Sequence, residues 1–130
     1  RRDGMRTQEH AMAVGRGHLA YYQAMARRGE IKSVRGIDDL DEAVAAWQYP
    51  TETTPIYHIL SMESADPILG PDQVPEWYDL GLRMVSISHY GTSTYSHGTG
   101  TEGGLLPPAK PLLDALKNAG IIVIWIPALM

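Results

Sequence analysis

Three short apolar runs, separated by segments with a helical pattern, constrain the fold of this chain more than any other feature. The runs cover residues 55–62, 82–88 and 121–126. Apolar residues on both faces of such a run are typical of a parallel strand that helices cover on both sides. Strands that alternate with helices predict an α/β fold in which right-handed crossovers join about three parallel strands.

Helical periodicity fills the segments around these runs. The spacing of apolar residues predicts helices over residues 7–28, 38–48, 72–80 and 109–118. In the second of these, Asp39 and Glu42 form a pattern like a capping box. The side chains expected on its apolar face are Leu40, Ala43, Val44 and Trp47. Glycines that can end a helix follow three of the segments, at Gly29, Gly81 and Gly120.

A sheet of three parallel strands has two unpaired edges, which is an unfavourable boundary for an independent domain. We therefore expect the 130 residues to form part of a larger structure.

Composition and charge exclude several classes of function. The net charge is −4 and the arginines form no continuous basic stripe, so binding to nucleic acid has little support. Cysteine is absent, which excludes disulfides and thiolate metal sites. No apolar run reaches the length of a membrane span, and the first residues lack the hydrophobic region of a signal peptide. A cytoplasmic location is therefore favoured.

Two candidate site residues follow two neighbouring strands. Glu63 lies where the first run ends, and His89 comes directly after the second. The carboxyl ends of parallel strands meet at one rim of the sheet, where α/β enzymes keep their chemistry. A carboxylate there can bind or bridge metal ions, and an imidazole can serve as ligand, acid–base group or oxyanion donor. The alternatives are an acid that caps the next turn and a histidine bonded to a backbone carbonyl.

The loop after the second run contains a glycine pattern, at residues 98–103, that matches the letters of a dinucleotide fingerprint. Its context is wrong, because such a fingerprint follows a strand immediately and opens a helix. Here about nine residues separate it from the strand, and Glu102 would repel a pyrophosphate. We expect no nucleotide site at this loop.

The other histidines and aromatic residues have weaker signals. None of His10, His18, His58 and His97 has a ligand partner at helical spacing, so the HExxH pattern of zinc sites is absent. We expect His58 to be a hydrogen-bonded core residue, whereas His97 lies in the loop, where it could face a substrate. The aromatic residues for which packing roles are expected are Tyr21, Tyr22, Trp47 and Trp77.

The segments described above resemble the membrane (renal) dipeptidase family, the zinc dipeptidases whose barrel is of the metal-dependent hydrolase (amidohydrolase-like) type. The run ILSMESADPI is similar to that family's strand ending in Glu-Gly-Ala-Asp-Pro. The segment GLRMVSISHYGTSTYSHGTGTEGGLLPP is similar to its Gly-x-Arg, Thr-His-Tyr-Gly, Tyr-x-His-Gly-Thr-Gly and Gly-Gly-Leu-Thr-Pro motifs. The helical segments LAYYQAMARRGEI and IDDLDEAVAAW also fit, so the likeness covers nearly the whole chain.

This resemblance implies a fold, a reaction and roles for two residues. The fold is a partial (β/α)8 TIM barrel in which residues 1–130 form one domain that lacks the N-terminal and C-terminal parts of the barrel. The implied reaction is hydrolysis of dipeptides at a binuclear zinc site. Glu63 corresponds to the carboxylate that bridges two zinc ions, and His89 to the histidine that contacts substrate and stabilises the tetrahedral intermediate.

Departures from the family pattern limit that expectation. The His-x-Asp ligand pair of the family's first strand occurs nowhere in this chain, and its later ligands come from strands beyond residue 130. Ser64 also stands where the family has glycine. We therefore expect the chain alone neither to hold two zinc ions nor to turn over substrate.

Two other classes of function stay open. One is a non-catalytic module that associates through its exposed strand edges, including association into a homo-oligomer. The other is an amidohydrolase-like metalloenzyme that acts on a different substrate.

Overall fold

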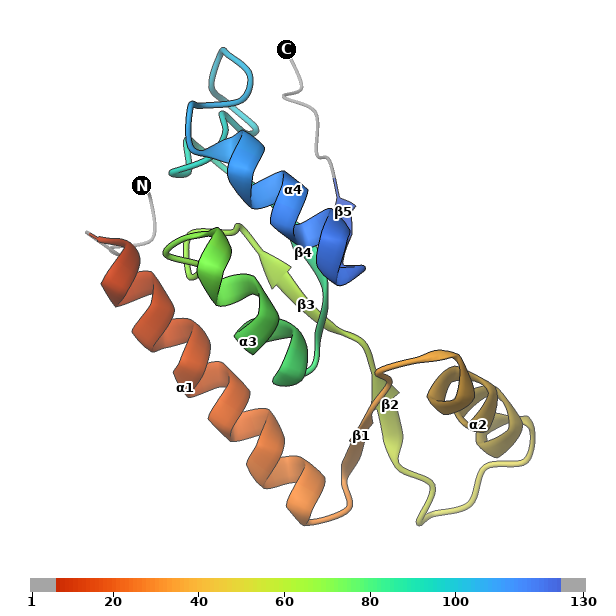
Figure 1. The fold of residues 1–130 in the computed structure, drawn as a ribbon. Helices are drawn as coiled ribbons and strands as arrows, with labels where there is room; N and C mark the ends of the chain where they lie inside the picture. The colour runs from red at the N-terminus through yellow and green to blue at the C-terminus, as the bar shows by residue number, and fades with distance from the viewer. Residues whose placement is uncertain (1–6, 125–130) are drawn as a thin grey trace.

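The computed structural model describes residues 7–124 of the chain. Helices and strands alternate along it as the sequence predicts (Figure 1). The elements are α1 (Gln8–Arg27), β1 (Ile31–Ser33), α2 (Ile37–Gln48), β2 (Ile56–His58), β3 (Leu60–Glu63), a 3-10 turn (Pro71–Gln73), α3 (Val74–Asp79), β4 (Leu82–Ser86), α4 (Ala109–Ala119) and β5 (Ile122–Ile124).

The named strands pair only in parallel. One sheet has the order β3-β4-β5, and β1 and β2 form a second, two-stranded sheet. The expected α/β class with three parallel strands in one sheet is therefore confirmed. The run predicted as one strand over residues 55–62 is divided at Ile59, because its first half pairs with β1 and its second half with β4. Strand β1 is not predicted from the sequence, because it has only three residues.

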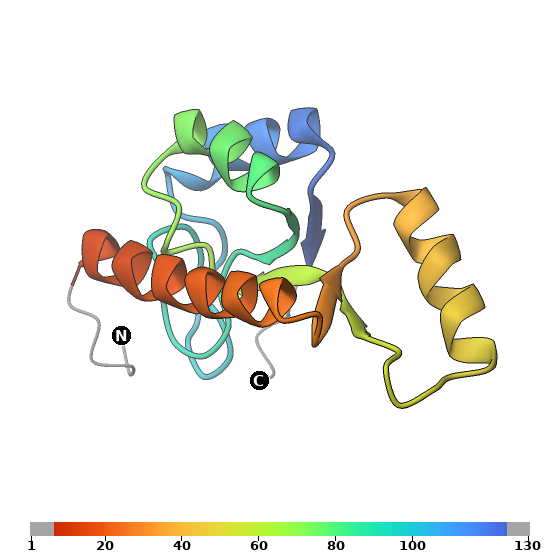
Figure 2. The ribbon, with the colours of Figure 1, turned by 90° about the horizontal axis from the view of Figure 1, so that it is seen from below.

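Helices α3 and α4 cover one face of the three-stranded sheet (Figure 2). The core between these helices and the sheet contains Trp77, Val85, Leu112 and Leu116, each no more than 2% exposed. Helix α4 matches its predicted pattern, and Gly120 ends it with a φ of 76°, which a glycine adopts without strain. The predicted last strand is confirmed over β5, and residues 125 and 126 of that prediction lie outside the described residues.

Side chains of β3 alternate between the core and the open side of the sheet. Leu60 and Met62 pack against the core, whereas Ser61 and Glu63 are exposed. This two-residue period follows from strand geometry and places Glu63 on the side away from α3 and α4.

Helix α1 begins after Thr7, whose side chain accepts a hydrogen bond from the backbone N–H of His10. Gly15 allows α1 to approach the loop after β3, because a Cβ there would lie 3.3 Å from the Cβ of Pro67. Arg16 stacks on the ring of Trp77 at 4.2 Å. Of the aromatic residues expected to pack, Trp77 is buried in the core, but Tyr21, Tyr22 and Trp47 are exposed.

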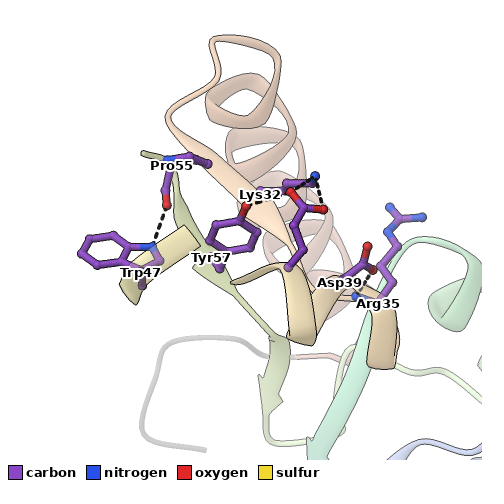
Figure 3. Close-up of polar contacts among 7 residues, drawn as sticks. Lys32, Arg35, Asp39, Trp47, Pro55 and Tyr57 are labelled. Carbon is purple, nitrogen blue, oxygen red and sulfur yellow. Dashed lines mark hydrogen bonds and ion pairs between the residues drawn. The ribbon is translucent and has the colours of Figure 1, made fainter. Parts of the chain in front are cut away.

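Polar contacts hold α2 to strands β1 and β2 (Figure 3). Glu42 accepts hydrogen bonds from the Lys32 ammonium at 2.6 and 2.8 Å and from the Tyr57 hydroxyl at 2.9 Å. These bonds, led by that from Lys32, lower the pKa of the Glu42 carboxyl. Trp47 donates its indole N–H to the Pro55 carbonyl at 3.0 Å.

One expectation for α2 is wrong, and its predicted apolar face is not covered by another element of the described chain. No residue of α2 is buried, and Leu40, Val44 and Trp47 are exposed. Asp39 and Glu42 do not form a capping pair, because Asp39 instead accepts from the backbone N–H of Arg35 at 2.8 Å. Their spacing fits a capping box, but the helix begins earlier, with Gly36 at the N-cap.

His58 differs in part from its expected role as a hydrogen-bonded core residue. It is partly buried, its ring lies 5.7 Å from that of Tyr22, and its Nδ1 has no hydrogen-bond partner among the described residues. Burial lowers the pKa of His58, and a hydrogen bond with the Lys32 backbone only partly offsets this effect.

Candidate active site

Glu63 and His89 lie in direct contact at the carboxyl ends of β3 and β4. The Nδ1 atom of His89 is 2.7 Å from Oε1 of Glu63. The Glu63 side chain is 69% exposed and that of His89 32% exposed, so both remain accessible from the open side of the sheet. The expectation that these two side chains share one rim is confirmed. Their roles in metal and substrate binding stay predictions.

A short loop holds the backbone of His89. The Thr99 N–H donates to the His89 carbonyl at 2.7 Å, and the Gly91 N–H donates to the Thr99 carbonyl at 3.0 Å. The Tyr90 ring packs edge-on against the His89 ring, with 4.5 Å between centroids, and is itself exposed. The loop therefore holds the backbone of His89, and the Tyr90 ring contacts one side of its imidazole.

Buried serines connect this loop to the end of β4. Ser93 donates its hydroxyl to the Ile87 carbonyl at 2.8 Å, and Ser88 donates to the His97 carbonyl at 3.1 Å. The Ser93 hydroxyl also accepts from the backbone N–H groups of Tyr95 and Ser96, at 3.1 and 3.0 Å. A buried network in which the polar groups are hydrogen-bonded favours a single conformation of the loop.

The glycine pattern at residues 98–103 serves packing within this loop. A Cβ on Gly98 would lie 2.2 Å from the His89 carbonyl oxygen, and a Cβ on Gly103 would lie 2.4 Å from the His97 ring. Gly103 also has a φ of 133°. These glycines permit close approach within the loop, which accounts for the glycine pattern by packing alone.

His97 points into its own loop. Its Nδ1 is 3.2 Å from the Thr92 hydroxyl, and its ring packs over Gly103. The geometry therefore explains His97 as part of the loop, and nothing in it assigns a substrate contact.

Asp66 joins the loop after Glu63 to the loop after His89. Its Oδ1 accepts from the Thr94 backbone N–H at 2.8 Å, and its Oδ2 is 3.4 Å from the Ser64 hydroxyl. Tyr95, next to Thr94, donates its hydroxyl to the Ile68 carbonyl, and burial raises the pKa of that hydroxyl. Asp66 is not among the site residues predicted from the sequence, although its place three residues after Glu63 is a usable signal.

A pocket of about 450 Å³ opens beside Glu63, between α1 and β3. Apolar and polar groups share its lining: Leu19, Met62 and Trp77 are among the apolar residues, and Glu63, Ser64 and Asp66 are among the polar ones. A cavity that combines apolar walls with a few polar groups is the usual form of a small-molecule site.

The donor set does not complete a metal site. Within residues 7–124, no group of three or more His, Asp or Glu side chains could hold a metal ion. Glu63 is the expected ligand in this region, and one of its oxygens contacts His89. The residues present therefore do not fit a binuclear zinc centre by themselves.

No helix in the described part of the chain is long and apolar enough to cross a membrane.

Comparisons with known proteins bear on the fold. No family model and no curated protein matches the chain. Among solved structures, an amidohydrolase from Pseudomonas aeruginosa matches 90% of this chain with a TM-score of 0.71 and 15% identity. The probable dipeptidase PvdM from the same organism matches 93% with a TM-score of 0.70 and 17% identity. A metallo peptidase from Rhodobacter sphaeroides, liganded with a phosphinate mimic of the dipeptide L-Ala-D-Ala, matches 89% with a TM-score of 0.66 and 24% identity.

These matches establish a likeness of fold, and they confirm the resemblance to amidohydrolases and dipeptidases at that level. The chain spans 32–34% of the length of these structures, or about a third. The activity, substrates and metal content of a whole enzyme of this kind are therefore proposals for this chain.

Proposed function

We propose that this chain is part of a hydrolase with a (β/α)8 barrel that cleaves dipeptides with the help of zinc. The observation that carries the proposal is the contact between Glu63 and His89 at the rim where parallel α/β enzymes place their chemistry. The likeness in fold to a dipeptidase and to a metallo peptidase liganded with a dipeptide mimic supports the substrate class.

Glu63 is the proposed metal-binding carboxylate, and bound zinc would supply Lewis-acid polarisation of the scissile carbonyl. His89 is the proposed catalytic residue. In its protonated form it donates Nδ1–H to Glu63, which leaves Nε2–H free to donate to the oxyanion of a tetrahedral intermediate. The pocket between α1 and β3 is lined by Glu63 of this pair and offers apolar side chains, among them Leu19 and Met62, to a substrate side chain.

The described residues hold one proposed zinc ligand, so the chain alone is expected to retain no zinc after dialysis and to hydrolyse no dipeptide. Elemental analysis and a dipeptide assay on the purified chain check this expectation. Two tightly held ions with metal-dependent turnover would contradict it.

A chimaera tests the proposed roles directly. Residues 7–124 would replace the matching third of the Rhodobacter sphaeroides metallo peptidase, and zinc content and hydrolysis would be measured with dipeptides, N-acyl amino acids and lactams. We expect dipeptide hydrolysis, loss of zinc in E63Q, and loss of turnover with zinc retained in H89A. Full activity of both variants would overturn the roles, and a preference for lactams or N-acyl amino acids would favour the other amidohydrolase-like chemistry.

A non-catalytic module is the second candidate, because α2 and β5 expose apolar side chains. Ile37, Val44 and Ile122 are each more than half exposed, at 68%, 57% and 59%. Unpaired strand edges beside such residues favour pairing with another chain. Size-exclusion chromatography at several concentrations distinguishes the two proposals, since a monomer at all concentrations would argue against the module.

A further inference from the structure

We infer that Asp66 is a positioning residue, which sets the distance between Glu63 and His89 by fastening the loop of one to the loop of the other. This inference rests on the proposed function, because it matters for catalysis only if Glu63 and His89 form the site. The alternatives are that Asp66 acts through its negative charge, as a further metal ligand would, or that it only stabilises the fold.

Hydrogen bonds within each of the two loops hold that loop in one conformation. On one side, two residues separate Asp66 from Glu63, and one of them, Ala65, is fully buried. The Ile68 N–H closes a turn onto the Ala65 carbonyl at 2.9 Å. The carboxylate of Asp66 therefore has a defined position relative to the end of β3.

On the other side, Thr94 is fixed relative to His89. Ser93, directly before it, bonds to the Ile87 carbonyl at 2.8 Å and receives the Tyr95 N–H at 3.1 Å. Thr99 closes the loop onto His89 at 2.7 Å. A shift of Thr94 would therefore be transmitted to His89.

Asp66 joins these two rigid parts across 28 residues of sequence, through Oδ1 and the Thr94 N–H at 2.8 Å. A carboxylate that accepts from a backbone N–H makes a charge-assisted bond, which is stronger and shorter than a neutral one. The second fastening, from Tyr95 to Ile68, lies farther along from Glu63. Of these two bonds, that between Asp66 and Thr94 lies nearer in sequence to both Glu63 and His89.

The contact to be maintained is between Nδ1 of His89 and Oε1 of Glu63. Since a carboxylate oxygen accepts, Nδ1 carries the proton, and the hydrogen bond selects that tautomer of the neutral ring. The tautomer therefore reports whether the two side chains still meet. It can be read by nitrogen NMR at alkaline pH on the metal-free chain, with neither substrate nor zinc present.

We would measure the His89 tautomer ratio in the unsubstituted chain and in E63A, D66A, D66N and D41A. Loss of a hydrogen bond of ordinary strength changes such a ratio by about fivefold. We expect D66A to shift His89 toward the Nε2–H form as E63A does. We expect D66N to keep the ratio of the unsubstituted chain, because an asparagine oxygen still accepts from Thr94 and its NH2 group can donate to Ser64. D41A, which removes an exposed acid of α2, is the matched control for loss of charge.

Each other result overturns the inference. An unchanged ratio in D66A, together with faster exchange of the Thr94 amide, would mean that Asp66 is only structural. A shift in D66N equal to that in D66A would mean that the charge acts and not the hydrogen bond. If D66A does not fold, D66E keeps the charge but displaces the oxygens by one methylene, and an unchanged ratio there also overturns it. The tautomer ratio is measured without turnover. It therefore tests the role of Asp66 even if the chain proves not to belong to a dipeptidase.

Discussion

The backbone N–H of Thr99 donates to the carbonyl of His89 at 2.7 Å, and this approach leaves no room for a side chain at residue 98. An added Cβ on Gly98 would lie 2.2 Å from the His89 oxygen and 2.8 Å from that of Gly91. Both neighbours are backbone atoms, so they cannot move aside as a flexible side chain would.

We therefore expect G98A to lower the free energy of unfolding by about 2–3 kcal/mol, as overpacking in a rigid site does. G104A is the matched control, because a Cβ there meets nothing within 4 Å. Urea denaturation measures both. Equal stability of the two variants would contradict the close approach.

Ser64, directly after Glu63, has a φ of 85°, in the left-handed region that costs a side-chain-bearing residue about 1–2 kcal/mol. Glycine removes that strain but loses more conformational entropy on folding, about 0.5–1 kcal/mol. We expect S64G to raise the free energy of unfolding by up to about 1 kcal/mol. S64A, which lacks the hydroxyl but keeps the strain, serves as control and should show no gain. Thermal denaturation of the two variants checks the difference.

Glu63 and His89 contribute little to stability, because their side chains are 69% and 32% exposed. A double-mutant cycle of E63A and H89A, followed by urea denaturation, should give a coupling energy below about 1 kcal/mol. A coupling above about 3 kcal/mol, typical of a buried pair, would indicate that the contact is there to hold the fold.

His58 should make stability depend on pH. Burial lowers the pKa of His58 in the folded chain below its ordinary value of 6.5, so the unfolded chain binds more protons between the two values. Stability is then fully present above pH 6.5 and is lost as the pH falls through the lowered pKa. We expect H58F, which keeps a ring beside Tyr22, to be less sensitive to acid over this range.

The control for that experiment is H10F, which removes an exposed histidine of α1. Thermal denaturation at a series of pH values should give the same acid-induced loss for H10F as for the unsubstituted chain. A loss that is unchanged in H58F would assign the acid sensitivity to other groups.

Elements with a strong local pattern could be predicted from the sequence. The period of Leu112 and Leu116 predicted α4, because both face the core and Gly120 ends the helix with a local signal. The meeting of Glu63 and His89 followed from a rule of parallel sheets, since strand ends share a rim whatever the rest of the fold does.

Features that depend on distant partners could not be predicted. The break at Ile59 is hidden because both halves of the run are apolar, and only pairing with two different strands reveals it. The apolar face of α2 follows a helical period, yet periodicity does not say whether another element covers it. The bond between Asp66 and Thr94 joins two irregular loops, for which no period exists.

Residues 56–63 are divided between two sheets, and this division determines where the chain can tolerate insertions or deletions. Leu60 and Met62 face the core while Ser61 and Glu63 face outward, and inserting or deleting one residue within the run would exchange these faces. Glu63 would then be directed into the apolar core that contains Trp77. This would happen even though the sequence of every helix is unchanged. In the exposed segment of residues 50–53, side chains do not alternate between two faces of a sheet. Insertions should therefore be tolerated there and not within β3.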